Sequence, residues 1–214
     1  MCQIMKRIIV VCLIFVGIIC SEETIGQSFS AEATGMESFW SFSGTFNTNL
    51  TKKSKMSFSN TARISSDYLG QEDTRMLVMS NFGYTFSPKL KTTFGGMYIS
   101  RGGVKPSIGL QYAVVRKHML WVFFPNFNIG KKSNLMAISA IQYLGKITEK
   151  LMFVSKMQSL CMLSDEGHLF STMRFRSGIV RGKYQIGAAS DLNFSGNEFT
   201  FAKSFGLFMQ YQIF

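Results

Sequence analysis

From Trp40 to the carboxy terminus, the chain alternates apolar and polar residues in short runs that turns separate. The first clear run places Trp40, Phe42 and Leu50 on one face and Ser41 and Asn47 on the other. A period of two residues is typical of a β-strand with one face in an apolar medium and the other in water. The pattern therefore predicts an all-β chain made of antiparallel hairpins.

Eleven such runs follow one another, at about 38–50, 55–66, 75–86, 90–100, 105–116, 119–129, 134–145, 150–162, 168–180, 183–194 and 204–214. The runs at 119–129 and 134–145 are apolar on both faces and do not indicate which face is wet. Barrels formed by one bacterial chain usually have an even number of strands, with short turns on the periplasmic side and longer loops outside. Tight turns and longer loops alternate along this chain, so the run at 38–50 goes from the outer side to the periplasmic side. A strand that runs in the opposite direction must precede it, and residues 27–34 are the candidate. We expect twelve strands, with ten and a separate amino-terminal piece as the alternative.

Large apolar residues occupy one face of almost every run, which predicts a sheet whose outer face contacts lipid. A sheet in lipid cannot leave an edge of unpaired N–H and C=O groups, so it must close on itself. The predicted fold is a closed antiparallel transmembrane β-barrel over residues 27–214. A soluble secreted or lipid-anchored β-sandwich that binds a ligand, which also alternates, is the alternative. A charged content of 16% and 21 Phe residues favour the membrane barrel.

Residues 1–26 are predicted to be an export signal. Lys6 and Arg7 precede the apolar run 8–20, which is shorter than the about 20 residues of a membrane-spanning helix. Cleavage is expected between Cys20 and Gly26, and we favour Gly26 because small residues stand at 24 and 26. Cys20 is the alternative as a lipidation site. Cys161 is then the one cysteine of the mature chain, so no disulfide framework is expected.

The last ten residues, FGLFMQYQIF, end in Phe214 and place Tyr211 and Ile213 in one register and Gln210 and Gln212 in the other. This segment resembles the carboxy-terminal strand of outer-membrane barrels, although the two glutamines stand where that strand usually carries hydrophobic residues. The mature chain as a whole resembles small outer-membrane β-barrel proteins of Gram-negative bacteria, of the Bacteroidota type. The resemblance implies a location in the cell outer membrane, contact with its lipids, and recognition by the barrel-assembly machinery through the strand that ends in Phe214.

If the apolar faces meet lipid, the opposite faces line the lumen. These predicted lumen residues are Arg63, Gln111, Lys156, Gln158, Arg174, Arg176, Gln185, Asp191, Asn193, Gln210 and Gln212. A cluster on neighbouring strands combines three cations with one carboxylate: Lys156, Gln158, Arg174, Arg176, Gln185 and Asp191. One interpretation is a structural network of ion pairs and hydrogen bonds that fills a narrow barrel. The other is a constriction that attracts small anionic solutes, which gives a narrow porin-like channel with a basic lumen.

The formal net charge of +11 does not indicate nucleic acid as a partner for an exported chain. Many of the cations fall in turns, where they are placed to meet lipid phosphates: Lys52, Lys53, Lys89, Lys117, Lys146, Arg181 and Lys183. Aromatic residues near strand ends suit the interfacial girdles of a barrel: Trp40, Tyr84, Trp121, Tyr143 and Tyr184.

No catalytic motif, metal-ligand cluster or cofactor-binding loop occurs in the sequence, so no catalytic residue, metal or cofactor is predicted. The alternative function is a lipid-modifying outer-membrane enzyme that uses His168, with Glu166 as the group that orients it and Ser171 nearby. His118, the second histidine, is expected to be a solvated turn residue.

Overall fold

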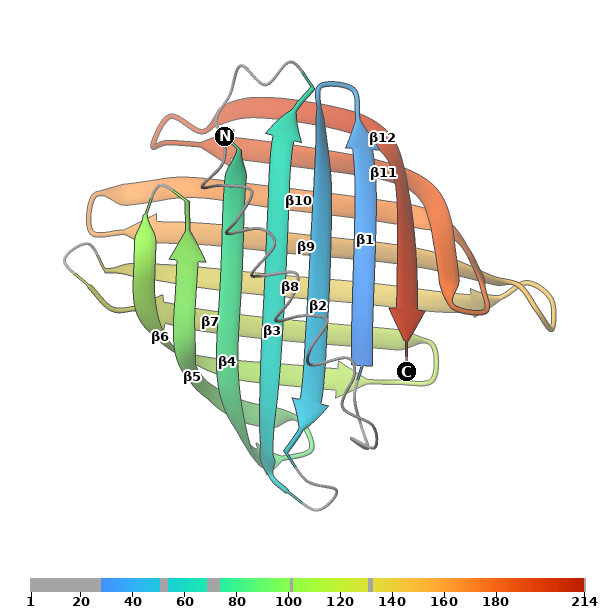
Figure 1. Ribbon diagram of the computed structural model, residues 1–214, viewed down its shortest axis with the longest axis horizontal. Coiled ribbons are helices and arrows are strands. Elements are labelled where there is room, and N and C mark those ends of the chain that lie inside the picture. The colour runs from blue at the N-terminus through green and yellow to red at the C-terminus, as the bar shows by residue number, and fades with distance from the viewer. Residues whose placement is uncertain (1–27, 51–53, 69–73, 101, 131–132, 214) are drawn as a thin grey trace, which may run out of the picture.

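A computed structural model describes residues 28–50, 54–68, 74–100, 102–130 and 133–213, and in them the chain forms a closed antiparallel barrel (Figure 1). Its strands are β1 (Ser28–Met36), β2 (Phe39–Asn49), β3 (Met56–Asp67), β4 (Arg75–Ser87), β5 (Leu90–Ile99), β6 (Gly103–Val115), β7 (Met119–Asn128), β8 (Asn134–Lys146), β9 (Met152–Ser164), β10 (Gly167–Arg181), β11 (Tyr184–Ser195) and β12 (Thr200–Ile213). The predicted export signal and Phe214 lie outside the described residues.

The barrel closes between its first and last strands. Phe29 to Met36 of β1 pair antiparallel with Ile213 to Gly206 of β12, and β1 pairs with β2 on its other side. The candidate strand at 27–34 is thereby confirmed as β1, and twelve strands, not ten, form the barrel. In Figure 1 the strands of the front wall, β1 to β4, cross those of the rear wall, because the strands of a closed barrel tilt against its axis.

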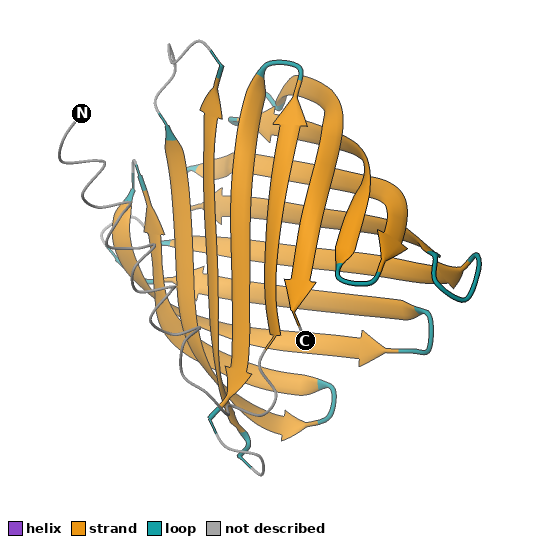
Figure 2. Ribbon diagram, turned by 45° about the vertical axis from the view of Figure 1, so that its right-hand side comes forward, coloured by secondary structure: helices purple, strands orange, loops and turns teal. Residues whose placement is uncertain are grey.

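Every described element of regular structure is a strand, as Figure 2 shows. No helix among the described residues is long and apolar enough to cross a membrane.

The two ends of the barrel are named here by the chain termini. At the terminal end, β1 begins and β12 ends; the far end carries the β1–β2, β3–β4, β5–β6, β7–β8, β9–β10 and β11–β12 connections.

The difference in length between the connections at the two ends is smaller than the sequence predicted. The expected longer loop at 163–167 is a turn of Asp165 and Glu166 alone, because β9 and β10 continue their pairing to Ser164 and Gly167.

The outer wall presents large apolar side chains. Phe42, Phe94 and Leu207 are examples, between about half and two thirds exposed. Six tyrosine and tryptophan residues lie near the terminal end: Tyr84, Tyr112, Trp121, Tyr143, Tyr184 and Tyr211. Contacts join some of them across neighbouring strands, with ring centroids 5.7 Å apart for Tyr112 and Trp121 and 5.1 Å apart for Tyr184 and Tyr211. Trp40, by contrast, lies at the start of β2, near the far end.

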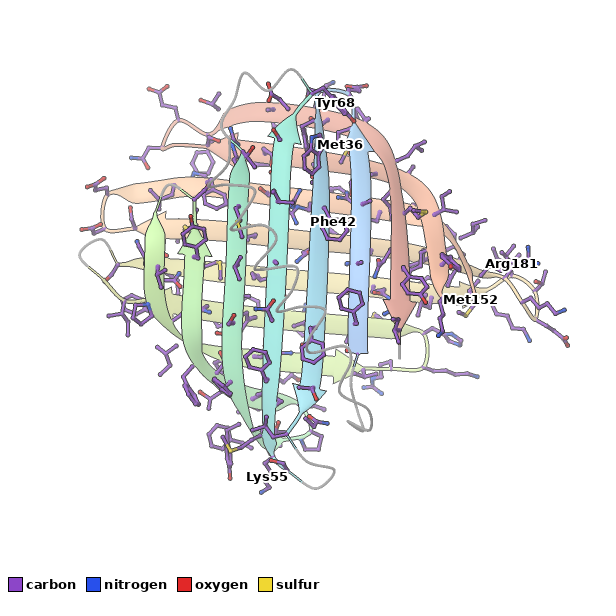
Figure 3. The ribbon with its side chains drawn as sticks, in the orientation of Figure 1. Met36, Phe42, Lys55, Tyr68, Met152 and Arg181 are labelled. Atoms are coloured by element: carbon purple, nitrogen blue, oxygen red, sulfur yellow. The ribbon has the colours of Figure 1, made fainter. Side chains whose placement is uncertain are left out.

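The cations of the turns gather beyond these aromatic residues. Those described are Lys55, Lys89, Arg116, Lys117, Lys146, Lys150, Arg181 and Lys183, all in or beside terminal-end connections; Lys52 and Lys53 lie outside the described residues. Figure 3 labels two of them, Lys55 and Arg181, at the rim of the barrel. Of the acidic turn residues, Glu37, Asp165, Glu166 and Glu198 lie at the far end and Glu149 lies at the terminal end. The described turns therefore place their cations at the terminal end and most of their carboxylates at the far end.

Candidate functional site

The interior of the barrel holds a network of charges centred on Asp191 of β11, which is 1% exposed. Its Oδ1 atom accepts a hydrogen bond from Nη1 of Arg176 at 2.7 Å. Its Oδ2 atom lies 3.5 Å from Nη2 of Arg63 and 3.8 Å from Nε of Arg174. Glu32 of β1 accepts a second bond from Arg176, at 3.1 Å from Nε. Three guanidinium groups therefore share two carboxylates, with Asp191 and Arg176 buried and the other three side chains partly exposed.

These ion pairs join strands that are not neighbours in the sheet. Arg63 stands on β3 and Asp191 on β11, with β2, β1 and β12 between them. Arg176 stands on β10 and Glu32 on β1, with β11 and β12 between them. A side-chain contact across that many strands must pass through the lumen, so the polar faces of these strands line the interior.

The sequence cluster is only partly brought together. Arg174, Arg176 and Asp191 meet, while Gln158 and Lys156 lie opposite Arg174 and Arg176 on β9 without joining the ion pairs described here. Gln185 lies nearer the terminal end and donates a hydrogen bond to Gln212 at 3.1 Å. The network also includes two residues outside the predicted cluster, Arg63 and Glu32. Arg63 was among the predicted lumen residues. Glu32 was not, because the short amino-terminal segment that contains it has no clear alternating pattern.

Methionines cross the other half of the lumen. Met97 of β5, Met136 of β8 and Met162 of β9 form a buried cluster, each 2% exposed or less. Partly buried residues pack against it: Met79, Ile99, Ile138, Leu160 and Phe170. This explains why the run at 134–145 is apolar on both faces, since its inner face supplies Met136 and Ile138 to the cluster.

The charged half and the apolar half of the lumen meet at two places on the barrel wall. Arg63 pairs with Leu77, two residues from Met79 of the methionine cluster. Arg174 pairs with Gln158, two residues from Leu160. We call the two halves together the lumen layer: Glu32, Arg63, Arg174, Arg176 and Asp191 on one side, and Met79, Met97, Met136 and Met162 on the other.

Two guanidinium nitrogens of the layer make no hydrogen bond within the described part of the chain. They are Nη1 of Arg63 and Nε of Arg174, both buried, and the latter has only the 3.8 Å ion pair with Asp191. Buried polar groups are otherwise almost always paired, and a positive charge raises the cost of leaving one unpaired. These donors are therefore suited to an anionic or strongly polar ligand in the lumen.

Between the lumen layer and the terminal end, the inner wall is polar and basic. The described side chains there include Lys91, Gln111, Gln142, Lys156, Gln185, Gln210 and Gln212. Lys91 donates a hydrogen bond to Ser57 Oγ at 3.4 Å. The carboxylates of the described inner wall lie elsewhere, Glu32 and Asp191 in the layer and Asp67 at the far end of β3. We call this region the basic vestibule.

His168 and Ser171 come together at the far end of β10. Nε2 of His168 lies 2.8 Å from Ser171 Oγ, and Nδ1 lies 2.8 Å from the carbonyl oxygen of Gly196. The Gly196 carbonyl thus takes the orienting position that the sequence assigned to Glu166. His118, in the β6–β7 turn, is exposed with its Nδ1 atom 3.1 Å from the Leu144 carbonyl oxygen. Within the described part of the chain, no group of three or more His, Cys, Asp or Glu side chains is placed to hold a metal ion.

No protein-family model matches the sequence. No curated protein matches it either. Several solved structures share the fold. The NanC porin matches with a TM-score of 0.53 and 6% identity, covering 88% of this chain and 100% of that one. The KdgM porin matches with a TM-score of 0.51 and 8% identity, covering 87% and 99%. LpxR from Salmonella typhimurium matches with a TM-score of 0.48 and 8% identity, covering 86% and 99%. At these identities the likeness to the two porins is one of fold: this chain is a twelve-stranded barrel of the kind found in outer-membrane porins.

Proposed function

We propose that this protein is an integral outer-membrane barrel that acts as a narrow channel for small anionic solutes. Its apolar outer wall suits contact with outer-membrane lipids, and its last strand suits recognition by the barrel-assembly machinery. The likeness in fold to the KdgM and NanC porins supports a channel-like barrel. The lumen layer supplies the selectivity.

The arrangement of cations in the lumen carries the proposal. Arg63, Arg174 and Arg176 surround two carboxylates and leave a net positive charge in the layer, and two buried guanidinium nitrogens make no hydrogen bond within the described residues. The basic vestibule adds Lys91 and Lys156 on the terminal side. Charge of one sign in a narrow passage with low-dielectric walls raises the local concentration of the opposite ion.

A passing anion would exchange with the carboxylates as the partner of the arginines. Arg174 is the best placed to do so, because its Nε atom lies 3.8 Å from Asp191, the longest of the ion pairs, and its side chain is 25% exposed. A guanidinium group can bind a carboxylate or phosphate oxygen through two parallel N–H donors. The anion would then pass from Arg174 to Lys156 of the vestibule, which lies two residues along β9 from the partner of Arg174, Gln158.

The test is the selectivity of single channels in a planar bilayer under a salt gradient. We expect the reversal potential of the native protein to indicate anion preference. Arg174→Gln and the double variant Arg174→Ala with Arg176→Ala are expected to lower that preference at least several-fold. Arg181→Ala is the matched control, since Arg181 is exposed at the rim of the same strand. A native channel that prefers cations, or variants with unchanged selectivity, would contradict the proposal.

A structural barrel without transport is the second candidate, and the methionine cluster favours it. Met97, Met136 and Met162 are buried against one another across the lumen, and apolar side chains in a constriction exclude hydrated ions. The absence of any ion current from the folded native protein would select this candidate over the channel.

A further inference from the structure

The pair formed by His168 and Ser171 has the hydrogen-bond arrangement of a base and a nucleophile. A carbonyl oxygen only accepts hydrogen bonds, so the contact between Gly196 O and His168 Nδ1 places a proton on Nδ1. In the neutral imidazole, Nε2 is then the acceptor, and at 2.8 Å it receives the hydroxyl proton of Ser171. The ring is oriented on one side and faces a hydroxyl on the other, as nucleophile activation requires.

The histidine is held by the β11–β12 connection. Asn197 Oδ1 accepts the backbone N–H of His168 at 2.8 Å, and Asn197 Nδ2 donates to the Glu166 carbonyl at 3.0 Å. The ring of Phe199 stacks on the imidazole with centroids 4.3 Å apart. His168 is 9% exposed as a result. A fixed ring in a dry setting keeps its hydrogen-bond geometry while a substrate binds.

Left-handed backbone conformations gather around the pair. Phe199 is the one described non-glycine residue with positive φ, at 52°, which is strained, and Gly196 and Gly167 adopt φ of 70° and 112°. The β9–β10 pairing shifts register between His168 and Phe170, which marks a bulge. Bulges and strained residues of this kind recur beside functional sites, where they aim a side chain.

Ser171 belongs to the outer face of the barrel. It pairs with Cys161 on β9 and with Phe194 on β11, and it shares its face with the exposed Phe175. Exposed apolar side chains surround this part of the wall: Leu163, Leu169, Phe199 and Phe201. A reactant that reaches Ser171 therefore arrives from the lipid side and brings acyl chains with it.

A cation also lies on this part of the outer face. Phe194 pairs with Phe201, and Lys203 lies two residues further along β12 on the same outer face, where it is exposed. An ammonium group on a lipid-facing wall extends toward headgroup phosphates. Acyl chains, an ester and a phosphate together describe a glycerophospholipid.

We propose that Ser171 is a nucleophile and His168 its base for the hydrolysis of phospholipid acyl esters at the far rim of the barrel. Ser171 Oγ bonds to the ester carbonyl carbon while its proton moves to His168 Nε2. The tetrahedral adduct breaks its bond to the alcohol oxygen, which leaves with the proton from Nε2. Water then attacks the acyl-Ser171 ester, gives one proton to Nε2, and releases the fatty acid, and that proton returns to Ser171 Oγ.

The test uses the folded protein in mixed micelles of detergent and phosphatidylethanolamine, with a long-chain alkyl fluorophosphonate as the covalent probe. We expect the adduct on Ser171 by peptide mass analysis and fatty-acid release that Ser171→Ala abolishes. His168→Ala is expected to slow labelling at least about 100-fold, the usual contribution of a general base. Ser159→Ala is the matched control, because Ser159 also faces outward on β9 and pairs with Met173 and Ser139.

Three outcomes would overturn the proposal. Absence of an adduct on Ser171 in folded protein removes the nucleophile, and labelling at an unchanged rate in a folded His168→Ala variant removes the base. Labelling without fatty-acid release removes the phospholipid ester as substrate. Because the variants can perturb the rim, heat-modifiable gel migration must first report a closed barrel. If the His168→Ala variant does not fold, His168→Gln takes its place, and labelling at an unchanged rate in that folded variant counts against the proposal in the same way. None of these results depends on the channel proposal.

Discussion

Asp191→Asn is the substitution that tests most directly whether the lumen layer stabilises the barrel. The carboxylate of Asp191 balances three guanidinium groups at 2.7, 3.5 and 3.8 Å and is almost fully buried. Asparagine keeps the shape of the side chain and an oxygen for Arg176. It removes the charge that offsets the repulsion among the arginines.

The magnitude follows from these distances. With an effective dielectric constant of about 20, each of the three attractions is worth about 4–6 kcal/mol in gross Coulomb energy. Desolvation and repulsion among the arginines oppose most of that sum. Removing one partner of a buried ion pair typically costs about 3–5 kcal/mol, because it leaves the other charge buried and unpaired. We expect Asp191→Asn to lower the free energy of unfolding by that amount.

The assay is urea unfolding of the protein in lipid vesicles, followed by tryptophan fluorescence and by heat-modifiable migration. Asp165→Asn is the control, since Asp165 is exposed in the β9–β10 turn and its loss is expected to change stability by less than about 0.5 kcal/mol. Equal stability of the Asp191 variant and the native protein would refute the reasoning, because the arginines would then not need the carboxylate.

Three further predictions concern the rest of the barrel. Met97→Ala with Met136→Ala should raise single-channel conductance at least two-fold, because it removes two side chains that cross the lumen; unchanged conductance would place the constriction elsewhere. Gly187→Ala should prevent or slow barrel closure, because a Cβ atom there would clash with the Ser177 carbonyl oxygen. At Gly96 the nearest atom would be 3.6 Å away, so Gly96→Ala should fold normally by gel migration. The mature chain extracted in detergent should migrate faster before heating than after, and a single unshifted band would contradict a closed membrane barrel.

Most of the fold could be predicted from the sequence, because strand alternation and turn residues are local signals. The twelfth strand followed from parity and direction, since residues 27–34 had to supply an upward strand. The ends of β9 and β10 were harder to predict. Their pairing continues through Ser164 and Gly167, where Asp165 and Glu166 suggested a longer loop.

The site was less accessible to the sequence, because its contacts cross the lumen. Periodicity placed Arg174, Arg176 and Asp191 on one face, but nothing local indicates that Arg63 reaches Asp191 past three intervening strands. The methionine cluster was missed because Met97, Met136 and Met162 come from three different strands, and because the run that carries Met136 is apolar on both faces. His168 was predicted as a candidate base from its residue type. Its partner at Nδ1, however, is the main-chain carbonyl of Gly196 in a distant turn, and such a contact has no sequence signature.

The pairing of β1 with β12 has a consequence for how the chain folds. This interface joins the two strands that are most distant in sequence, so closing it carries the largest loop-closure entropy of any strand pair in the sheet. We expect this closure to be a slow step in folding. Until that interface forms, both strands expose unpaired backbone, and a partner that holds one of them would govern the rate.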